Sequence, residues 1–324
     1  MPGKVSPDDL LSHVFARTGA ADEAVLQGPA IGEDAAAIDL SGETLVVSSD
    51  PISLAASRIG TLGVNVACND VAVSGADPRW LTAVVMLPDE GVLEGITDDL
   101  DAAARDLGVA IVGGHSEYVD ALERPIVSLT AMGTTEQFVS TGGAEPGDSV
   151  LITKAAAVEG TAILAADFGD DLEVPREVCE RAETFLEEIS VVPDARVLRE
   201  FATAMHDPTE GGVAAGLHEL ARASGVRLEV DPDAIPIREE TRLLCDAVGV
   251  DPLRIFGSGS VVATVPAEDV DDALEALADA GLEAAEIGTV REAEDEPELR
   301  LGEESIVDPI EDDLYPLWAE ADAD

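Results

Sequence analysis

The chain has 324 residues and carries 68 acidic against 18 basic side chains, a formal net charge of −50. This charge argues against nucleic-acid and anionic-membrane partners, and no apolar run approaches the roughly 20 residues of a membrane span. Apolar residues still make up 46% of the chain, so the composition predicts a folded globular protein rather than an acidic disordered one. The acid excess, with Lys4 and Lys154 as the only lysines, indicates adaptation to high salt, which screens dense like charge.

The length predicts two domains at about 150 residues each. A turn-rich stretch at 140–148 marks the boundary, so we expect an N-terminal domain over 1–140 and a C-terminal domain over 141–324. The first five residues lack the apolar stretch of a signal peptide, which predicts a cytoplasmic protein. The three cysteines (Cys68, Cys179 and Cys245) show no metal-binding spacing and are expected to be buried, reduced thiols.

Helical and strand periodicities alternate through the first half. A helix is predicted over 6–18, capped by Ser6 with Asp9 three residues on. It is followed by apolar or alternating runs that predict strands over 44–49, 80–87, 109–112 and 125–132, and by helical spacing over 58–75 and 91–107. This alternation predicts an α/β or α+β domain.

The second half repeats the alternation. Strands are predicted over 149–153, 226–230, 260–265 and 284–289, and helices over 159–167, 174–188, 193–204, 211–223, 238–248 and 267–280. The segment beyond the last of these, rich in Asp and Glu, is expected to be peripheral. This pattern predicts a second domain of the same class.

Acidic residues stand at the ends of apolar runs, at Asp34, Asp50 and Asp70, with Asn69 beside the last of them. In so acidic a chain, any single carboxylate is expected to be a solvated surface group. Several that terminate buried elements could instead converge on one mouth of an α/β core. Convergent carboxylates favour Mg²⁺ and a polyphosphate, since Mg²⁺ is held by one or two carboxylates together with the phosphates of its substrate.

Two features of the second half point to an anion. Lys154 directly follows an apolar strand in a chain that has nearly eliminated lysine, so its charge could meet a phosphate or simply lie on the surface. Gly211 and Gly212 open a helix whose free N–H groups could face an anion. Thr209 as an ordinary helix cap is the alternative explanation of that loop.

Five strings occur in one order along the chain: Gly32-Glu33-Asp34-Ala35-Ala36, Ser48-Ser49-Asp50, residues 69–78 (NDVAVSGADP), Gly113-Gly114-His115-Ser116-Glu117 and residues 206–212 (HDPTEGG). In this the sequence resembles the ATP-binding superfamily of aminoimidazole ribonucleotide (AIR) synthase. That family also contains thiamine-monophosphate kinase, selenophosphate synthetase and the hydrogenase maturation factor HypE. The last string, with the Asn-Asp pair, looks most like the HypE branch.

The resemblance implies a two-domain PurM-like fold in which the N-terminal domain forms a β-barrel across a homodimer and the C-terminal α/β domain covers ATP. It implies catalytic roles for Asp50, Asp70 and Asp207, and Mg²⁺ ligands at Asp34, Asp50, Asp70, Asp207 and, in place of an acid at position 115, Glu117. It also implies nucleotide contacts by Gly32, Asn69, Gly113, Gly114, His115, Lys154, Gly211 and Gly212.

The chain departs from family patterns at two places. His115 stands where thiamine-monophosphate kinases carry an acid, which counts against that activity. HypE uses a cysteine at its extreme C-terminus, whereas this sequence ends in Trp318-Ala319-Glu320-Ala321-Asp322-Ala323-Asp324. We therefore expect a Mg²⁺- and ATP-dependent enzyme that phosphorylates or activates a small or protein-borne acceptor of unknown identity. Thiamine-monophosphate kinase and a nucleotide-dependent maturation or scaffold protein without turnover remain the alternatives.

Overall fold

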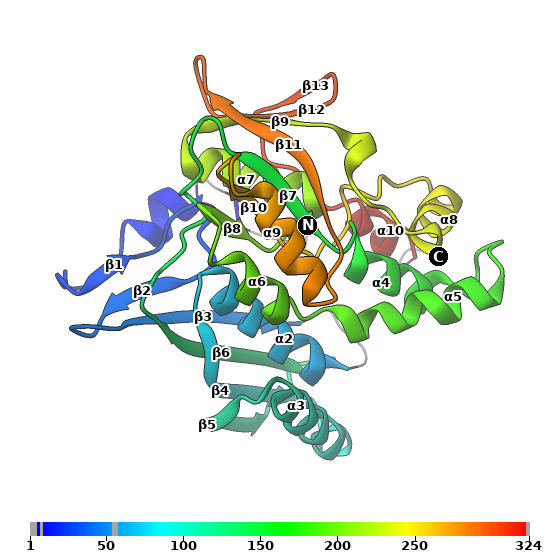
Figure 1. Ribbon diagram of the computed structural model, residues 1–324. Coiled ribbons are helices and arrows are strands. Elements are labelled where there is room, and N and C mark those ends of the chain that lie inside the picture. Colours follow the sequence, from blue (N-terminus) through cyan, green and yellow to red (C-terminus); the bar gives the residue numbers. More distant parts are fainter. Residues whose placement is uncertain (1–4, 7–8, 54–57, 322–324) are drawn as a thin grey trace. The chain divides into compact units, whose positions relative to one another are not determined.

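The computed structural model describes residues 5–6, 9–53 and 58–321. Residue contacts divide the chain into two compact units: an N-terminal unit of Glu23–Gly28 and Asp34–Phe138, and a C-terminal unit of Met1–Asp22, Pro29–Glu33 and Val139–Asp324. Each unit has its own sheet with helices packed on it (Figure 1). The predicted mixed α/β class is confirmed. The domain division at residues 140 and 141 stays a prediction.

The sheet of the N-terminal unit has six strands in the order β1-β2-β3-β6-β4-β5. Its neighbouring strands are antiparallel except β4 and β5, which are parallel. The strands are β1 (Val25–Gln27), β2 (Ala36–Asp39), β3 (Thr44–Ile52), β4 (Asp77–Leu87), β5 (Ala110–Tyr118) and β6 (Ile126–Thr135). The four strands predicted in this half are all present, and the short β1 and β2 were not predicted.

Two helices, α2 (Ile59–Val73) and α3 (Leu93–Leu107), belong to this sheet. α2 contacts β3 and β6, and α3 packs on α2. The contact is close because Gly63 has no side chain: a Cβ there would lie 2.4 Å from Cδ1 of the buried Leu129. Along β4, buried Leu81 and Val85 alternate with residues such as the exposed Val84, so one face of the sheet is covered and the other is open. Both predicted helices are confirmed.

Strand β5 differs from the prediction. The sequence predicts a strand over 109–112, but the strand runs from Ala110 through Gly113 and Gly114 to Tyr118. It is the edge of the sheet, and all nine of its residues are exposed. The two glycines do not end it because Gly114 is needed inside the ladder, where its backbone approaches β4.

The sheet of the C-terminal unit has seven strands in the order β13-β12-β9-β11-β7-β10-β8. They are β7 (Ser149–Thr153), β8 (Ala204–His206), β9 (Val226–Val230), β10 (Val262–Val265), β11 (Ala284–Glu292), β12 (Glu298–Leu301) and β13 (Glu304–Ile306). The four predicted strands are confirmed, two of them with the predicted bounds. The helix predicted over 193–204 ends at Leu198, because the chain then turns to pair β8 with β10.

The helices of this unit fall into two groups. α7 packs on β8, β9, β10 and β12, and α9 packs on β11. α4, α5, α8 and α10 surround a second apolar cluster that includes Leu164, Leu244 and Ile255. The bounds are α4 (Val158–Phe168), α5 (Arg176–Glu183), α6 (Val192–Leu198), α7 (Gly212–Ser224), α8 (Glu239–Val248), α9 (Val270–Asp279) and α10 (Leu314–Ala321), with 3-10 turns at Thr184–Glu188 and Pro232–Ala234. The N-terminal unit has a 3-10 turn at Glu90–Val92.

The predicted N-terminal helix is shorter than expected. Leu10–Phe15 forms a π-helical turn, and Ser6 Oγ accepts a hydrogen bond from the N–H of Asp9 at 3.2 Å. The predicted pairing of Ser6 with Asp9 is therefore confirmed, whereas residues 7 and 8 of that helix lie outside the described residues. Among the helices that the structure describes, none has the length and apolar character needed to cross a bilayer.

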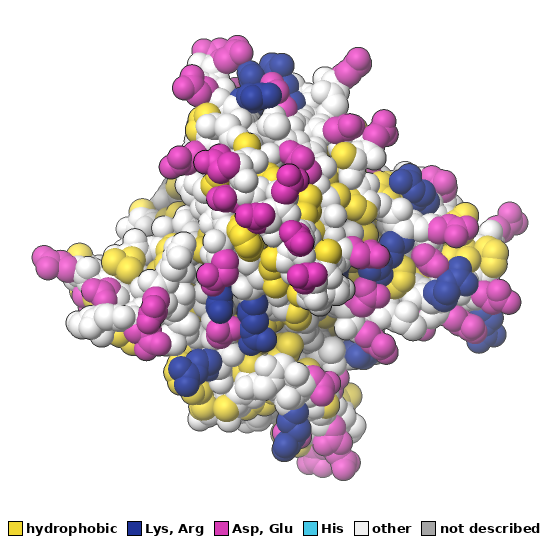
Figure 2. Space-filling model, in the orientation of Figure 1, with side chains coloured by type: hydrophobic (Ala, Val, Ile, Leu, Met, Phe, Trp, Pro, Cys, Tyr) yellow, Lys and Arg dark blue, Asp and Glu magenta, His cyan; other side chains and the backbone are white. Residues whose placement is uncertain are grey.

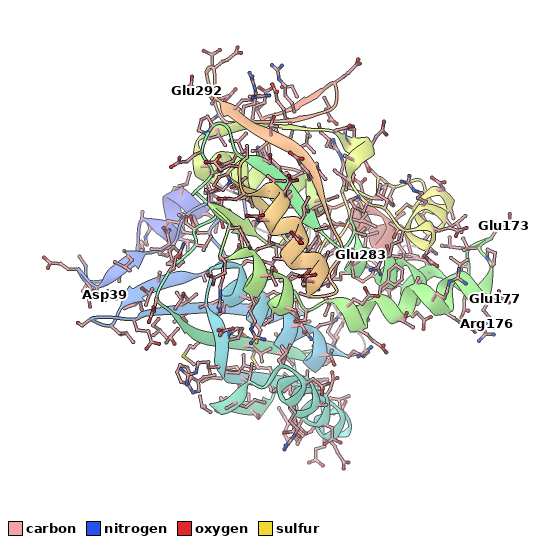
Figure 3. All side chains as sticks on the ribbon, in the orientation of Figure 1. Asp39, Glu173, Arg176, Glu177, Glu283 and Glu292 are labelled. Carbon is pink, nitrogen blue, oxygen red and sulfur yellow. The ribbon has the colours of Figure 1, made fainter. Side chains whose placement is uncertain are left out.

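On the face shown in Figure 2, acidic side chains are spread out rather than gathered in one patch. The labelled carboxylates of Glu173, Glu177, Glu283 and Glu292 extend into solvent from different elements (Figure 3). Carboxylates held against buried elements are therefore the informative ones.

Candidate nucleotide and metal site

Two of the predicted acids meet in the N-terminal unit. Asp50 lies on β3 and Asp70 on the last turns of α2, and the hydroxyl of Ser48 lies between them. Ser48 Oγ is 2.5 Å from Oδ2 of Asp70 and 3.2 Å from Oδ2 of Asp50. The covered face of the sheet brings them together, because Ser48 and Asp50 are two residues apart on β3 and so point to the same side, toward α2.

The convergence of two carboxylates on one hydroxyl favours a cation, because like charges close together repel each other. Asp70 is buried and Asp50 half-buried, so their mutual repulsion is screened less than on the open surface. Hard oxygen ligands held at one point are the donor set that Mg²⁺ prefers. The pair therefore fits the predicted metal role.

The end of α2 is fixed by its own hydrogen bonds. Ser74 Oγ donates to the carbonyl oxygen of Asp70 at 2.9 Å, and Asn69 is fully buried beside Asp70. Because this turn is anchored, the Asp70 carboxylate is positioned by the helix rather than by a mobile loop.

The structure does not bring Glu117 or His115 to this pair within one chain. Asp50 pairs across the ladder with Leu129, on the face that α2 covers. His115 and Glu117 lie on the open face beside Val84, with 3.6 Å between His115 Nε2 and Glu117 Oε2. Asp50 and Glu117 thus lie on opposite faces of the sheet of one chain, and the predicted metal role of Glu117 stays a prediction.

The paired glycines of β5 have a structural explanation. A Cβ on Gly114 would lie 1.9 Å from the carbonyl oxygen of Ala83, whereas a Cβ on Gly113 would meet nothing closer than Thr82 Cγ2 at 4.0 Å. Gly114 thus permits the close pairing of β5 with β4. This pairing explains why position 114 is a glycine, without the expected approach of its backbone to a nucleotide.

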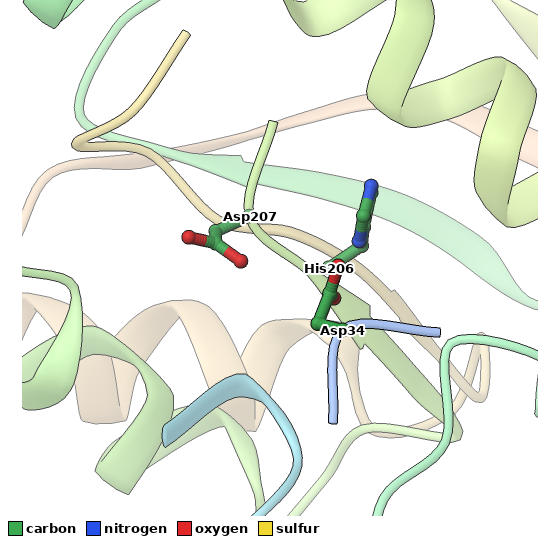
Figure 4. A group of neighbouring side chains, drawn as sticks. All are labelled: Asp34, His206 and Asp207. Atoms are coloured by element: carbon green, nitrogen blue, oxygen red, sulfur yellow. The ribbon is translucent and has the colours of Figure 1, made fainter. Parts of the chain in front are cut away.

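In the C-terminal unit, β8 ends at His206 and the next residue is the fully buried Asp207 (Figure 4). A ring nitrogen of His206 and a carboxylate oxygen of Asp207 lie within 4.8 Å of each other. His206 Nε2 is also 2.9 Å from Oε2 of Glu219 on α7. Glu219 thus holds the imidazole, and the Asp207 carboxylate lies near that ring.

The start of α7 is less open to an anion than the sequence predicted. The N–H of Gly211 donates to Asp312 Oδ2 at 2.8 Å, that of Gly212 to the carbonyl of Thr209 at 3.1 Å, and that of Ala214 to the carbonyl of Leu253 at 2.9 Å. Most of the donors expected to face a phosphate are therefore occupied. The two glycines have φ of +76° and +66°, and a Cβ on Gly212 would lie 2.6 Å from the carbonyl oxygen of Ile255. They are required by the turn and its packing.

Lys154 is also occupied. Its ammonium is 3.1 Å from Asp194 Oδ2 and donates to the carbonyl oxygens of Glu188 and Ser190 at 3.1 and 2.7 Å. An ammonium has three N–H donors, and three protein oxygens surround this one. We therefore leave Lys154 out of the candidate phosphate ligands.

The first glycine loop lies where the chain passes into the N-terminal unit. Gly32 has φ of +80°, and a Cβ there would lie 3.1 Å from the carbonyl oxygen of Glu219. Glu33 accepts hydrogen bonds from Ser140 Oγ at 2.5 Å and from the N–H of Gly142 at 3.3 Å. Asp34 is half-buried and follows directly. Glu33 is thus an anchor of this segment, while Asp34 keeps its predicted metal role as a hypothesis.

Three residues of interest carried no assignment from the sequence: Ser48, Glu159 and Asp312. Burial raises the pKa of Glu159 to about 7, reinforced by the charges of Asp312 and Glu210 and opposed by a hydrogen bond from Ser258. Burial likewise raises the pKa of Asp312 to about 7. Glu159 stands at the start of a helix, where an acid is unremarkable in sequence, and only its depth in the fold distinguishes it.

Similarity to known proteins agrees with this arrangement. Residues 32–135 match the AIR synthase related protein N-terminal domain, and residues 145–299 match the corresponding C-terminal domain. The carbamoyl dehydratase HypE of Cupriavidus necator is 33% identical over 279 residues, which cover 81% of this chain and 77% of that protein. The hydrogenase expression/formation protein HupE of Azotobacter chroococcum is also 33% identical, over 80% of this chain and 79% of that protein.

The solved structure of Escherichia coli HypE superposes with a TM-score of 0.71 at 27% identity, covering 90% of this chain and 93% of that one. Two α/β units with these sheets therefore define a PurM-like two-domain protein. The chain belongs to the AIR synthase related family, in its HypE branch.

Proposed function

We propose that this protein is a Mg²⁺-dependent ATP-binding enzyme of the HypE-like group that cleaves ATP to phosphorylate or activate an acceptor. The observation that carries the proposal is the sharing of one hydroxyl, that of Ser48, by the carboxylates of Asp50 and Asp70. A HypE structure 28% identical to this chain, with a TM-score of 0.65 and covering 92% of it, is described as a complex with ATP, which supports the nucleotide.

The proposed roles follow from the chemistry of phosphoryl transfer. Bound Mg²⁺ would supply neutralisation of the phosphate charge. Asp34, Asp50 and Asp70, all of the N-terminal unit, are proposed to hold that cation. Asp207 of the C-terminal unit is proposed as a ligand of the Mg²⁺-bound phosphates. Such reactions depend on positioning and electrostatics more than on covalent chemistry by the protein, so the fixed end of α2 and the hydroxyl of Ser48 contribute by keeping the acids in place before ATP binds.

We propose that none of the chain's three thiols is the acceptor and that another molecule supplies the acceptor group. Cys68, Cys179 and Cys245 are all buried, and burial raises the pKa of Cys68 and of Cys245 to about 12. A thiol must be ionised and accessible to act as a nucleophile. A HypE–HypF complex is among the similar structures, at 26% identity and a TM-score of 0.69, which supports an acceptor group delivered by a partner protein.

A homodimer is proposed for the assembly. The edge strand β5 has no neighbouring strand on its outer side in the part of the chain that the structure describes, and it carries the exposed apolar residues Ile111, Val112 and Tyr118. An exposed edge of this length is a liability that pairing with a second copy removes. His115 and Glu117 lie on this strand, so they are proposed to act at the dimer interface rather than in the Asp50–Asp70 pair.

Thiamine-monophosphate kinase remains an alternative function, but the similarity to such kinases supports only a shared fold. The complex of AaThiL with AMPPCP and TMP superposes with a TM-score of 0.72 but is 22% identical. The described residues around Asp50 are equally compatible with a scaffold that binds ATP without turnover, and release of ADP separates that alternative from the enzyme.

The test is isothermal titration of Mg·ATP into the protein in multimolar KCl, with Asp50→Asn and Asp70→Asn as variants. Asp98→Asn, an exposed acid on α3 of the same unit, is the matched control. We expect each site variant to weaken binding by at least about tenfold, because a charge-assisted ligand is lost, and the control to bind as the natural chain does. Absence of binding by the folded natural protein would refute the proposal.

ADP release is then measured with and without thiamine monophosphate. Turnover that requires thiamine monophosphate would establish the kinase alternative. Binding with no ADP under any condition, including addition of a purified carbamoyl-carrying partner, would favour the scaffold.

A further inference from the structure

Hydrogen bonds hold the loop that leads into α7 from two sides within the C-terminal unit. On one side, the N–H of Gly257 donates to the carbonyl oxygen of Thr209 at 2.9 Å. The N–H of Ala214 donates to the carbonyl oxygen of Leu253. On the other side, Asp312 Oδ2 accepts from the N–H of Gly211 at 2.8 Å. The first two contacts are made by backbone and the third by a side chain, so Asp312 is the partner that a single substitution can remove.

The contact between Asp312 and Gly211 is buried and directional. A buried N–H without a partner costs free energy comparable to a lost hydrogen bond, and an ionised acceptor makes the bond stronger. The other oxygen of Asp312, Oδ1, accepts from the N–H of Leu314 at 3.0 Å. Leu314 is the first residue of α10, so one carboxylate joins the start of α7 to the start of α10.

α10 is itself anchored, which fixes Asp312. The rings of Tyr315 and Trp318 each stand edge-on to Phe256 with centroids 6.0 Å apart. Trp318 Nε1 also donates to Asp167 Oδ2 at 2.9 Å. These contacts immobilise the segment that carries Asp312, and such aromatic pairs stabilise beyond the area they bury.

The same carboxylate lies in acidic surroundings. The charges of Glu210 and Asp313 face Asp312, and the N–H groups of Leu314 and Gly211 offset them. An isosteric amide would keep one acceptor oxygen but would set its NH2 group against the other N–H, so Asp312→Asn is the milder variant and Asp312→Ala the disruptive one.

We propose that Asp312 is a positioning residue: by accepting the N–H of Gly211 it fixes the loop from Asp207 to Gly212 and thereby the carboxylate of Asp207. The inference rests on the proposed function, because it assigns Asp207 a contact with the Mg²⁺-bound phosphates. The C-terminal segment that begins at Asp312 is then part of the site's support.

The experiment combines two measurements on the full chain in multimolar KCl. Hydrogen exchange followed by mass spectrometry reports the amides of the peptide spanning 207–213, and titration reports the affinity for Mg·ATP. We expect Asp312→Ala to accelerate exchange in this peptide at least about tenfold and to weaken Mg·ATP binding roughly tenfold. Asp312→Asn, which keeps only one of the two acceptor oxygens, should change both in the same direction by a smaller factor. Glu311→Ala, at the neighbouring exposed acid, should change neither.

The outcomes separate the inference from the function. If the natural protein does not bind Mg·ATP, the proposed function fails, while faster exchange at 207–213 in Asp312→Ala still supports the structural part. Unchanged exchange in that variant would overturn the inference even if ATP binds normally. Should Asp312→Ala lose protection throughout β7 as well, Asp312→Asn decides: faster exchange confined to 207–213 together with weaker Mg·ATP binding supports the inference, and unchanged exchange there or global loss of protection overturns it.

Discussion

The ammonium of Lys154 lies 3.1 Å from the carboxylate of Asp194, and both are sequestered, with 12% and 0% of their side chains exposed. Lys154 directly follows β7, and Asp194 is near the start of α6. The ion pair therefore ties a central strand of the C-terminal sheet to a helix 40 residues later. Removing one partner of a buried pair leaves the other charge uncompensated, which is more costly than losing both.

Replacing Lys154 by Met is accordingly expected to lower the free energy of unfolding by about 3–5 kcal/mol. The double variant Lys154→Met/Asp194→Asn should recover part of that loss, since the buried charge is gone. Denaturant unfolding in multimolar KCl measures both. A Lys154→Met protein of natural stability that bound Mg·ATP ten times more weakly would show instead that Lys154 contacts phosphate.

Much of the fold was predictable from the sequence because its signals are local. Strands β7 and β9 have the predicted bounds, since uninterrupted or alternating apolar runs determine them. The role of Lys154 was not predictable, because its partners lie 34–40 residues away and are fixed by packing. The same holds for Gly114: the pattern showed paired glycines, but the reason is a carbonyl on a neighbouring strand.

The acids of the site were found through ordered motifs rather than through periodicity. The hydrogen bond from Ser48 that joins Asp50 to Asp70 spans 22 residues, so it follows only from packing α2 on β3. The setting of Glu117 was not predictable for a related reason. The strand predicted over 109–112 extends to Tyr118, and alternation along it turns the Glu117 side chain to the face opposite Asp50.

Glu159 gives the protein a specific pH dependence. Its pKa is raised from 4.5 in the unfolded chain to about 7 in the folded protein, so folding favours the protonated form. Below about pH 4.5 the side chain is protonated in both states, so the free energy of unfolding is unaffected. As pH rises from 4.5 through 7, the unfolded chain loses the proton first, and the free energy of unfolding falls by on the order of 3 kcal/mol. Stability therefore falls with rising pH across this window.

The variant Glu159→Gln cannot ionise and should lose this component. We expect it to be more stable than the natural protein at pH 8 and to show a flatter stability profile between pH 5 and 8. Denaturant midpoints at constant KCl concentration measure the profile, and Glu268→Gln, at an exposed acid of the same unit, is the control. Parallel profiles for Glu159→Gln and the natural chain would contradict the burial argument.

The two glycines of β5 provide a matched pair. Gly114→Ala places a Cβ against the carbonyl of Ala83 at a backbone φ of +150°, whereas Gly113→Ala points into open space. We expect Gly114→Ala to cost at least about 2 kcal/mol and Gly113→Ala to change stability by less than about 0.5 kcal/mol. Thermal unfolding of the two variants checks this. Equal effects would mean that β5 does not pair with β4 as the structure has it.

The edge position of β5 leads to the last prediction. Val112 is 58% exposed on a strand whose outer backbone groups lack a neighbouring strand in the described sheet. If two copies pair there, a charge at position 112 would be buried or would meet the same charge on the second copy, and either is unfavourable.

Sedimentation in multimolar KCl should give the natural chain twice its 33.5 kDa mass and the Val112→Glu variant the mass of one chain. Leu40→Glu, equally exposed at 54% in the turn between β2 and β3, should remain dimeric. A Val112→Glu protein that stays dimeric would place the interface elsewhere, and a monomeric natural chain would remove the homodimer proposal.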